Sequence, residues 1–396
     1  MTLLYFADIR FPLERANGIQ TMETCHALSR RGYHVSLVVR PDTQTPARDP
    51  FDYYGLQRID SLKIESAPVA GPSFARRAGY LAFALGRTLG AGRADAVFTR
   101  DLGVAAALLR TPRNMRPPLV YESHGYAPEV SEALPTLVAT ATKPGAAKLA
   151  RLRAREERVW RSADGYVTIT KGLADRLRSL FGDRARLAVV PDGCRIPAAP
   201  PDSGRVDSAE PVVAYAGHLY PWKGVDVLLE ALRRLPAARG LIVGGHESEA
   251  DLGRLKALAE RLGIRERVTF TGLVAPSKVP ELLQTADVLA LPNPVSAIST
   301  YFTSPLKLFE YMAARRPIVA SDLPAVREVL RHEATALLVP PGDPAALAAA
   351  VQRLAADRSF AERLAQSAFA AVQDFTWDRR AQRMAALLAE VAVSSG

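Results

Sequence analysis

The feature that most constrains the fold is a regular alternation of short apolar runs with amphipathic helical segments along almost the whole chain. Runs of four to seven mostly apolar residues predict buried strands, and each is followed by a segment with helical spacing of its apolar positions. This rhythm predicts an α/β fold with parallel sheets covered by helices on both faces. In the first half the expected strands are Leu3–Ala7, His34–Arg40, Ala96–Thr99, Pro118–Glu122, Gly165–Ile169 and Leu187–Val190, and the expected helices are Glu23–Gly32, Ala75–Leu89 and Lys148–Ser162.

The rhythm is interrupted once, between Pro191 and Pro211, where proline, serine, glycine and aspartate dominate. Such a composition is typical of an exposed connection between domains. After it the rhythm restarts with the strand VVAYAG and the helix VDVLLEALRRL. We therefore expect two Rossmann-like domains, over residues 1–190 and 211–375, joined by a linker over 191–210. Ligands of such sheets bind at the carboxyl ends of the strands, so we expect a central cleft there.

The charge is concentrated in the first half of the chain. Residues 1–190 carry 28 Lys and Arg against 18 Asp and Glu, and residues 191–396 carry 23 against 23, so the whole net charge of +10 lies in the first half. The densest stretch is Lys143 to Arg161. A one-sided basic surface attracts polyanions such as anionic lipid head groups or a phosphorylated substrate, although a solvated helix face explains the same charge. Nucleic acid is not expected, because no pattern of aromatic and basic residues accompanies it.

Composition also excludes several classes of protein. No apolar run approaches the roughly 20 residues of a membrane span, and the first residues are predicted to form a strand rather than a leader, so we expect a cytoplasmic protein. Cys25 and Cys194 cannot form a disulfide framework, and neither lies in a metal-spaced cluster. We therefore expect no structural zinc site.

Three loops that follow predicted strands of the second half carry candidate binding residues. The loop Tyr215–Gly224 places Lys223 just before a helix, where its charge can meet a phosphate beside the helix N-terminus. The pair Gly244–Gly245 allows close approach of a ligand to the backbone. The loop Asn293–Pro305 leads into a helix whose first N–H groups form an anion site. A solvent-facing lysine and an ordinary glycine turn are the alternatives.

The stretch SPLKLFEYMAARRPIVASD predicts a helix that runs into a short buried strand. Ser304 is the expected N-cap and Pro305 the first helical residue. Lys307 and Glu310 share one face of this helix, apart from its apolar residues. The simplest interpretation is a surface ion pair, which contributes under roughly 1 kcal/mol.

Taken together, these motifs resemble the retaining glycosyltransferases of the GT-B fold, specifically glycosyltransferase family 4. The resemblance covers nearly the full chain and rests on GHLYPWKG, on VTFTGLV, and above all on the stretch from Ser304 to Asp322, which is similar to the family's E-x7-E region. It implies that Glu310 binds the ribose of a nucleotide-sugar donor, because a carboxylate accepts hydrogen bonds from both hydroxyls. The further donor-site residues that it implies are Gly217, His218, Lys223, Gly244, Leu273, Val274, Ser304, Pro305, Leu306 and Lys307.

The first half resembles the same family. NGIQTMETCHALSRRGYHVSLVV is similar to its first loop, helix and strand, which implies that Gly18 approaches the donor phosphates. VYESHGY is similar to its strand-and-histidine element, which implies that His124 lies against the donor sugar. A buried structural histidine is the alternative. The last segment, residues 376–396, resembles the helix that crosses back to the first domain.

Two positions depart from the family pattern. His218 stands where an arginine is usual, and Phe302 stands where a first glutamate is common, eight positions before Glu310. One phosphate-neutralising charge is therefore weaker or absent, and Lys307 offsets part of it. Backbone amides of the loop, with Ser299 or Thr300, would replace the missing glutamate, unless the donor sugar differs or catalysis is impaired.

The resemblance implies a retaining transfer of a sugar from a UDP- or GDP-sugar to a hydroxyl acceptor, including a lipid-linked or phosphorylated one. It also implies that the reaction requires no metal and no cofactor. His124, Lys223 and Glu310 are the expected catalytic residues. The acceptor would bind in the first domain and the donor in the second, at the inner face of the membrane if the basic stretch binds lipid. A GT-B nucleotide-sugar epimerase, a transferase of soluble metabolites and a non-catalytic nucleotide- or glycan-binding scaffold are the alternatives. A dinucleotide-dependent dehydrogenase is not expected, because no G-x-G-x-x-G follows the first strand.

Overall fold

The computed structural model describes the chain except for residues 91–93, 138–140, 198–209, 247–249, 302–305 and 394–396. It divides into two compact units. Unit 1 consists of Met1–Ser131, Pro144–Gly193 and Trp377–Gly396, and unit 2 of Glu132–Lys143 and Cys194–Thr376. The sequence interpretation placed residues 132–143 in the first domain. Most of the predicted linker over 191–210 lies outside the described residues.

Unit 1 is built on a parallel sheet of seven described strands in the order β3-β2-β1-β4-β5-β6-β7. The strands are β1 (Thr2–Arg10), β2 (His34–Arg40), β3 (Leu62–Ser66), β4 (Ala96–Thr99), β5 (Leu119–Ser123), β6 (Gly165–Thr168) and β7 (Leu187–Val189). The helices are α1 (Ala16–Arg30), α2 (Pro50–Tyr54), α3 (Ser73–Leu89), α4 (Leu102–Leu108), α5 (Ala127–Leu137, whose second half groups with unit 2), α6 (Ala146–Ser162), α7 (Lys171–Phe181) and α16 (Trp377–Val393), with a 3-10 turn η1 (Arg113–Met115).

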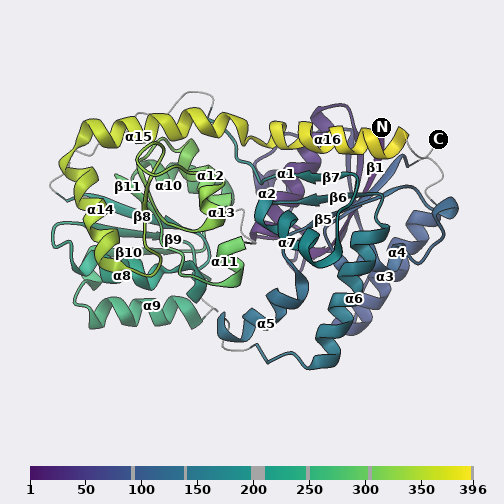
Figure 1. Cartoon of the computed structure of the whole chain (residues 1–396), viewed down its shortest axis with the longest axis horizontal. Coiled ribbons are helices and arrows are strands. Elements are labelled where there is room, and N and C mark those ends of the chain that lie inside the picture. The colour runs from purple at the N-terminus through teal and green to yellow at the C-terminus, as the bar shows by residue number, and fades with distance from the viewer. Residues whose placement is uncertain (91–93, 138–140, 198–209, 247–249, 302–305, 394–396) are drawn as a thin grey trace. The chain divides into compact units, whose positions relative to one another are not determined.

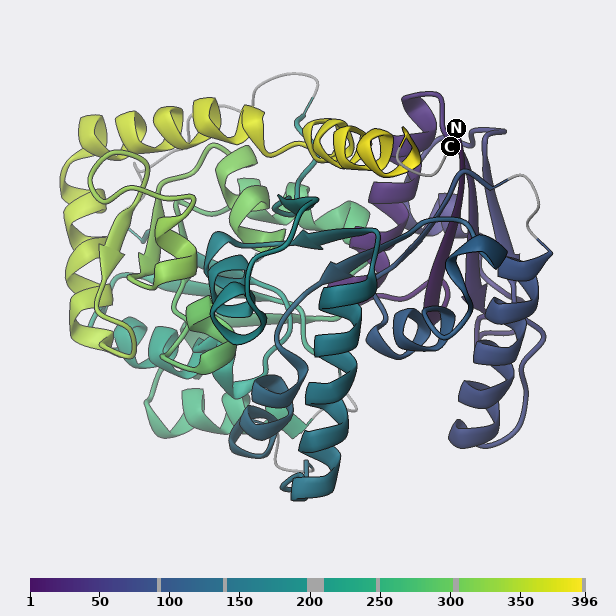
Figure 2. The same ribbon diagram turned by 45° about the vertical axis from the view of Figure 1, so that its right-hand side comes forward.

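Helices cover both faces of this sheet. Helix α16 packs against α1 and over β4, β6 and β7, whereas α3, α4 and α6 pack together on the other side (Figures 1 and 2). Gly165 lets α16 approach the sheet, because a Cβ there would lie 2.9 Å from a methyl of Val391. The chain thus returns to unit 1 at its C-terminal end, as the predicted fold class requires.

Unit 2 is built on a parallel sheet of six described strands in the order β10-β9-β8-β11-β12-β13. The strands are β8 (Val212–Ala216), β9 (Arg239–Val243), β10 (Val268–Gly272), β11 (Val288–Leu291), β12 (Ile318–Ser321) and β13 (Leu337–Val339). The helices are α8 (Val225–Arg233), α9 (Ala250–Arg261), α10 (Val279–Gln284), α11 (Ala297–Tyr301), α12 (Leu306–Ala313), α13 (Pro324–Arg327), α14 (Pro344–Ala356) and α15 (Arg358–Ala371), with 3-10 turns η2 (Pro221–Lys223), η3 (Arg265–Arg267), η4 (Pro276–Lys278) and η5 (Val372–Asp374).

The core of unit 2 lies in two layers. One apolar cluster fills the space between the sheet and α8, α9 and α14, and the other fills the space beneath α10, α12 and α15. Strands β11 and β12 are buried at every residue, which explains their apolar sequences VLAL and IVAS. The predicted α/β fold class with two parallel sheets is confirmed. Between the expected strand His34–Arg40 and the expected helix Ala75–Leu89, where no element was predicted, the structure has α2 and β3.

Candidate active site

Lys307 is held in the interior of unit 2 and not on its surface. Its side chain lies on α12, the residue is only 9% exposed, and Nζ donates a 2.5 Å hydrogen bond to Tyr215 Oη. Nζ also lies 4.0 Å from the centre of the Tyr215 ring, within the range of a cation–π contact. A surface ion pair between Lys307 and Glu310 is therefore excluded.

The turn after β8 is shaped to receive this lysine. Gly217 has a φ of +131°, and a Cβ there would lie 2.7 Å from Lys307 Nζ. Gly244, which follows β9 with a φ of +117°, approaches the same turn, because its Cβ would lie 2.4 Å from Gly217 O. Three predicted donor-site residues thus meet at the carboxyl ends of two neighbouring strands, where ligands of parallel sheets bind.

Lys223 ends the 3-10 turn η2, directly before α8. Gly224 then turns the chain with a φ of +72°, and a Cβ there would lie 1.9 Å from Pro292 O. Asn293 donates a 3.0 Å hydrogen bond to Trp222 O, so the loops after β8 and β11 are tied together. The burial of Lys223 lowers its pKa to about 8. An anion bound beside Lys223 would stabilise the charged form of this lysine.

The charges of Lys307, Lys223 and Glu310 act on one another. Burial lowers the pKa of Lys307 well below its ordinary value, the positive charge of Lys223 lowers it further, and Glu310 opposes both effects. Burial raises the pKa of Glu310, against the influence of Lys307 and Arg195. Two lysines and one carboxylate at the end of a sheet form a site that favours an anionic ligand.

The other described residues of unit 2 that were predicted to bind the donor lie in the loops after β8 and β10 and at the start of α12. His218 O accepts a 2.5 Å hydrogen bond from Tyr215 Oη, and its ring stacks on Tyr220 at 5.1 Å. Leu273 follows β10 and is 46% exposed, whereas Val274 packs against the core. Leu306 is the first residue of α12. Ser304, Pro305 and Phe302 lie outside the described residues.

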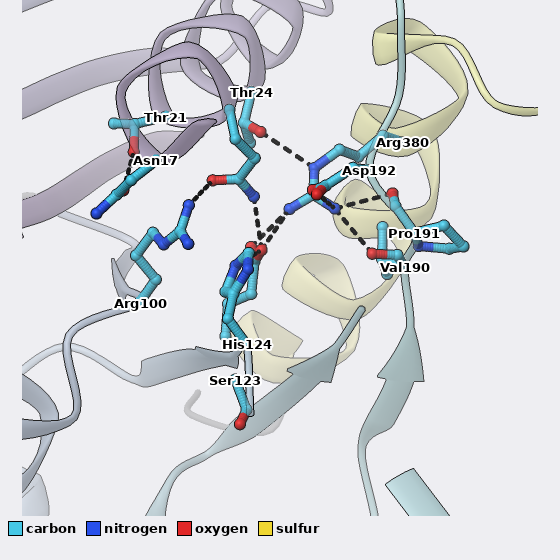
Figure 3. A network of polar contacts seen from close by, with 12 residues as sticks. Asn17, Thr21, Thr24, Arg100, Ser123, His124, Val190, Pro191, Asp192 and Arg380 are labelled. Carbon is cyan, nitrogen blue, oxygen red and sulfur yellow. Dashed lines mark hydrogen bonds and ion pairs between the residues drawn. The ribbon is translucent and has the colours of Figure 1, made fainter. Parts of the chain in front are cut away.

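In unit 1, His124 belongs to the polar network that Figure 3 shows. The contacts of this network centre on the buried carboxylate of Glu122. Nε2 of His124 lies 2.6 Å from Glu122 Oε1 at the end of β5. Burial, together with the charge of Arg100, lowers the pKa of His124 to about 4, so the ring is neutral at pH 7. Because Glu122 can only accept, Nε2 carries the proton and Nδ1 carries the lone pair.

Glu122 is the centre of this network, and the sequence interpretation did not single it out. It accepts hydrogen bonds of 2.6 and 2.7 Å from Arg380 and one of 2.6 Å from Gln20. Its burial raises its pKa, but Arg380 and His124 outweigh that effect and hold the pKa well below its usual range. The available signal was a carboxylate at the end of an otherwise apolar strand, in VYES.

Gly18 is buried on α1, against the loop that precedes the helix. A Cβ there would lie 2.2 Å from Leu13 O and 2.5 Å from Tyr54 Oη. The glycine is therefore required for close packing in unit 1, and its predicted contact with donor phosphates stays a prediction.

Within the described residues, no group of three or more His, Cys, Asp and Glu side chains is arranged to hold a metal ion. Among the helices described, none is long and apolar enough to span a bilayer.

Two family models match most of the chain. Residues 18–193 match the glycosyl transferase 4-like domain, and residues 210–357 match the glycosyl transferases group 1 domain. A D-inositol 3-phosphate glycosyltransferase of Nocardia farcinica is 33% identical over 284 residues, which are 67% of this chain and 60% of the relative. An alpha-D-kanosaminyltransferase of Streptomyces kanamyceticus is 32% identical over 40% of each chain. The chain spans about 60% or less of the length of these curated relatives.

Solved structures share the fold over the full length. Sucrose-phosphate synthase of Thermosynechococcus elongatus superposes with a TM-score of 0.81 at 20% identity, over 100% of both chains. The Anabaena HepE protein in complex with UDP-glucose gives a TM-score of 0.73 at 19% identity, over 98% of this chain and 100% of that one. With both family models matched and the fold shared, the chain belongs to the GT-B glycosyltransferases that combine a glycosyl transferase 4-like domain with a glycosyl transferases group 1 domain.

Proposed function

We propose that the protein is a retaining glycosyltransferase that moves a sugar from a nucleoside diphosphate sugar, UDP- or GDP-linked, to a hydroxyl acceptor. The observation that carries this proposal is the site formed by buried Lys307 with half-buried Lys223 and Glu310 at the carboxyl ends of β8 and β9. Each lysine is destabilised in its charged form by burial, and Lys307 also by the charge of Lys223. A diphosphate bound there would relieve both effects.

The donor would be oriented by groups of unit 2. Glu310, about one turn along α12 from Lys307, would accept hydrogen bonds from the ribose hydroxyls. Lys223, Lys307 and the backbone around Gly217 and Gly244 would contact the diphosphate, because the glycines leave the backbone accessible at that point. Exposed Leu273 would contribute apolar surface beside the base.

The reaction breaks the bond between the anomeric carbon and the diphosphate oxygen and forms a bond from the same carbon to the acceptor oxygen. The acceptor hydroxyl proton passes to the departing diphosphate, which leaves as a nucleoside diphosphate. Lys223 and Lys307 would stabilise the negative charge that develops on the leaving group. In this proposal the lysines supply the positive charge and no metal ion is required. Neutral His124 would orient a sugar hydroxyl through Nδ1, since Glu122 fixes its other nitrogen.

A second part of the proposal concerns where the acceptor is met. The basic residues of α6 from Lys148 to Arg161 are exposed, and the helix buries only Glu156, Val159 and Trp160. We propose that this face brings the protein to the anionic inner surface of the membrane, where a lipid-linked acceptor would be available.

The test uses thermal unfolding in the presence of UDP, GDP, ADP or TDP and their sugars. A ligand that binds the folded state raises the stability by RT ln(1 + [L]/Kd). One nucleotide should stabilise the wild type, and Glu310→Ala should weaken its affinity about tenfold or more, since two charge-assisted hydrogen bonds are lost. Glu281→Ala, an exposed change on α10 of the same unit, is the control and should leave affinity unchanged.

Turnover of the identified donor sugar, with the anomeric configuration of the product read by NMR, tests the retaining reaction. An inverted product would overturn the stereochemical assignment. Absence of binding by every nucleotide would favour the non-catalytic scaffold, and isomerisation of the donor sugar would favour the epimerase.

A further inference from the structure

Unit 1 contains a second cationic site, which the donor chemistry does not use. A cavity of about 590 Å³ lies at the carboxyl ends of β1 and β2, in the size range of small-molecule sites. Its lining combines apolar side chains, among them Ile9, Leu13 and Val69, with polar Asn17 and Thr43. Four arginines also line it, Arg10, Arg15, Arg40 and Arg76.

Two of these arginines are placed by the sheet itself. Arg10 and Arg40 end neighbouring parallel strands and are partners in the register of β1 and β2. Arg40 is anchored by Asp8 at 2.9 Å and Arg10 by an ion pair with Glu14, yet both side chains stay about 30% exposed. Guanidinium groups held in this way retain further donors for a ligand.

The other two arginines lie at helix N-termini. Arg15 is the N-cap residue of α1, and Arg76 lies in the exposed first turn of α3. Neither helix has a side-chain cap or an acidic residue in its first turn. The N-terminus of a helix favours negative charge, so an anion bound beside these arginines would also be stabilised by the helix ends. Arg76 makes no ion pair with any described residue.

Negative charge within the lining does not cancel these arginines. Asp42 is the one acidic residue of the lining, and its side chain is only 2% exposed. Arg48 donates two hydrogen bonds of 2.8 Å to it, and these bonds, which outweigh burial, hold the pKa of Asp42 well below its usual range. Asp42 is therefore neutralised by Arg48, which is not one of the four lining arginines, so it does not compensate the charge of Arg76.

We propose that this cavity binds the phosphate group of the acceptor, so that the acceptor is a phosphorylated hydroxyl compound. The inference rests on the proposed transferase function, since it identifies the cavity as the acceptor site. Arginine forks match the geometry of a phosphate, and the apolar lining accommodates the rest of a small molecule. The phosphate can belong to a free polyol phosphate or to a lipid head group.

The first experiment titrates inorganic phosphate by calorimetry at constant ionic strength into four proteins. They are the wild type, the double variant Arg15→Gln with Arg76→Gln, Lys223→Gln and the control Arg110→Gln, which removes an exposed charge beyond α4. Phosphate affinity should fall about tenfold for each pocket arginine removed. Arg110→Gln should leave phosphate binding unchanged, and Lys223→Gln should lose only the phosphate that binds at the donor site.

UDP and GDP are titrated into the same proteins. The affinity for the nucleotide that binds the wild type should fall in Lys223→Gln and should be unchanged in the double variant. If no nucleotide binds but phosphate binding still depends on Arg15 and Arg76, the donor proposal fails and the anion site stands. Phosphate binding that depends on Lys223 alone, or no phosphate binding, overturns the anion site.

A second arm distinguishes the two sources of phosphate. Glycerol 3-phosphate and inositol phosphate are compared with vesicles that contain phosphatidic acid or phosphatidylinositol. A soluble acceptor is supported when only the small molecules compete with inorganic phosphate, and a lipid acceptor when the vesicles bind in an Arg15- and Arg76-dependent way. If neither source depends on these arginines, the acceptor assignment is wrong.

Discussion

Arg380 and Glu122 are 258 residues apart in the chain and form a fully buried ion pair, in which both carboxylate oxygens of Glu122 accept from Arg380 Nη2, at 2.6 and 2.7 Å. Arg380 also donates to Val190 O at 2.8 Å, to Pro191 O at 2.9 Å and to Thr24 Oγ1 at 3.1 Å. One side chain of α16 thus joins α1, β5 and the end of β7 (Figure 3). The pair fixes the C-terminal helix on unit 1 and orients the residues around His124.

Arg380→Met should destabilise unit 1 by about 3–5 kcal/mol, because it leaves the buried carboxylate of Glu122 without its partner. Urea unfolding measures this change. Arg379→Met, at the exposed neighbouring position, should stay within about 0.5 kcal/mol of the wild type. Equal stability of both variants would show that the buried pair contributes nothing to the fold.

Donor affinity should fall as pH rises through about 8, the pKa of Lys223 in the free protein. Burial favours the neutral lysine, so below this pH the lysine is charged and binds the diphosphate, and above it the charge is lost. Nucleotide titrations between pH 7 and 9.5 measure the effect. Lys223→Arg, which stays charged, should abolish this fall, and a fall that persists in the variant would assign it to another group.

Glu156 should make stability depend on pH near neutrality. It is fully buried on α6, accepts a 3.0 Å hydrogen bond from Ala127 N, and burial raises its pKa to about 7. The pKa of Glu156 is higher in the folded state than in the unfolded state, so protonation of this carboxyl stabilises the fold. The free energy of unfolding should therefore decrease by about 3 kcal/mol as pH rises from about 4.5 to 7.

Glu156→Gln should remove that slope, which urea titrations at several pH values measure. Glu157→Gln is the matched control, since Glu157 is half exposed and pairs with Arg161 on the surface. If the slope of the wild type survives in Glu156→Gln, the buried carboxyl is not its source.

The exposed basic face of α6 should bind anionic vesicles. Arg151, Arg155 and Arg158 are all exposed on this helix. Each basic residue near such a surface contributes about 1 kcal/mol, so reversing three of them to glutamate should lower association at least about a hundredfold. Flotation with anionic vesicles at low and physiological salt measures this.

The control reverses three exposed arginines of unit 2, Arg233, Arg234 and Arg261, and should keep most of the association. If the wild type does not float with the vesicles at either salt concentration, the proposed membrane association is wrong.

Local patterns in the sequence were enough for most of the fold. The buried runs AVFT, VLAL and IVAS form the strands β4, β11 and β12, because continuous apolar runs fit only strands covered on both faces. In unit 1 the sequence interpretation did not predict α2, β3, α4, α5 and α7. The elements α2 and β3 are short, and their mixed sequences carry weak periodicity.

The residues of the donor site could be predicted from the sequence, but their geometry could not. Lys223, Lys307 and Glu310 could be named from their loops and helix, and the family resemblance assigned them to a nucleotide sugar. That Lys307 is buried against Tyr215 could not be read from the sequence, because burial depends on how α12 packs against β8. Nothing in the sequence indicated that Gly217 leaves room for its amino group.

By itself the sequence determined the alternation of strands and helices, the two parallel sheets and the family, because each depends on local periodicity and short motifs. Only the tertiary structure paired Glu122 with Arg380 and gathered Arg10, Arg15, Arg40 and Arg76 around one cavity. These residues belong to different elements, and their proximity is set by strand register and helix packing. Neither is encoded in the spacing of residues along the chain.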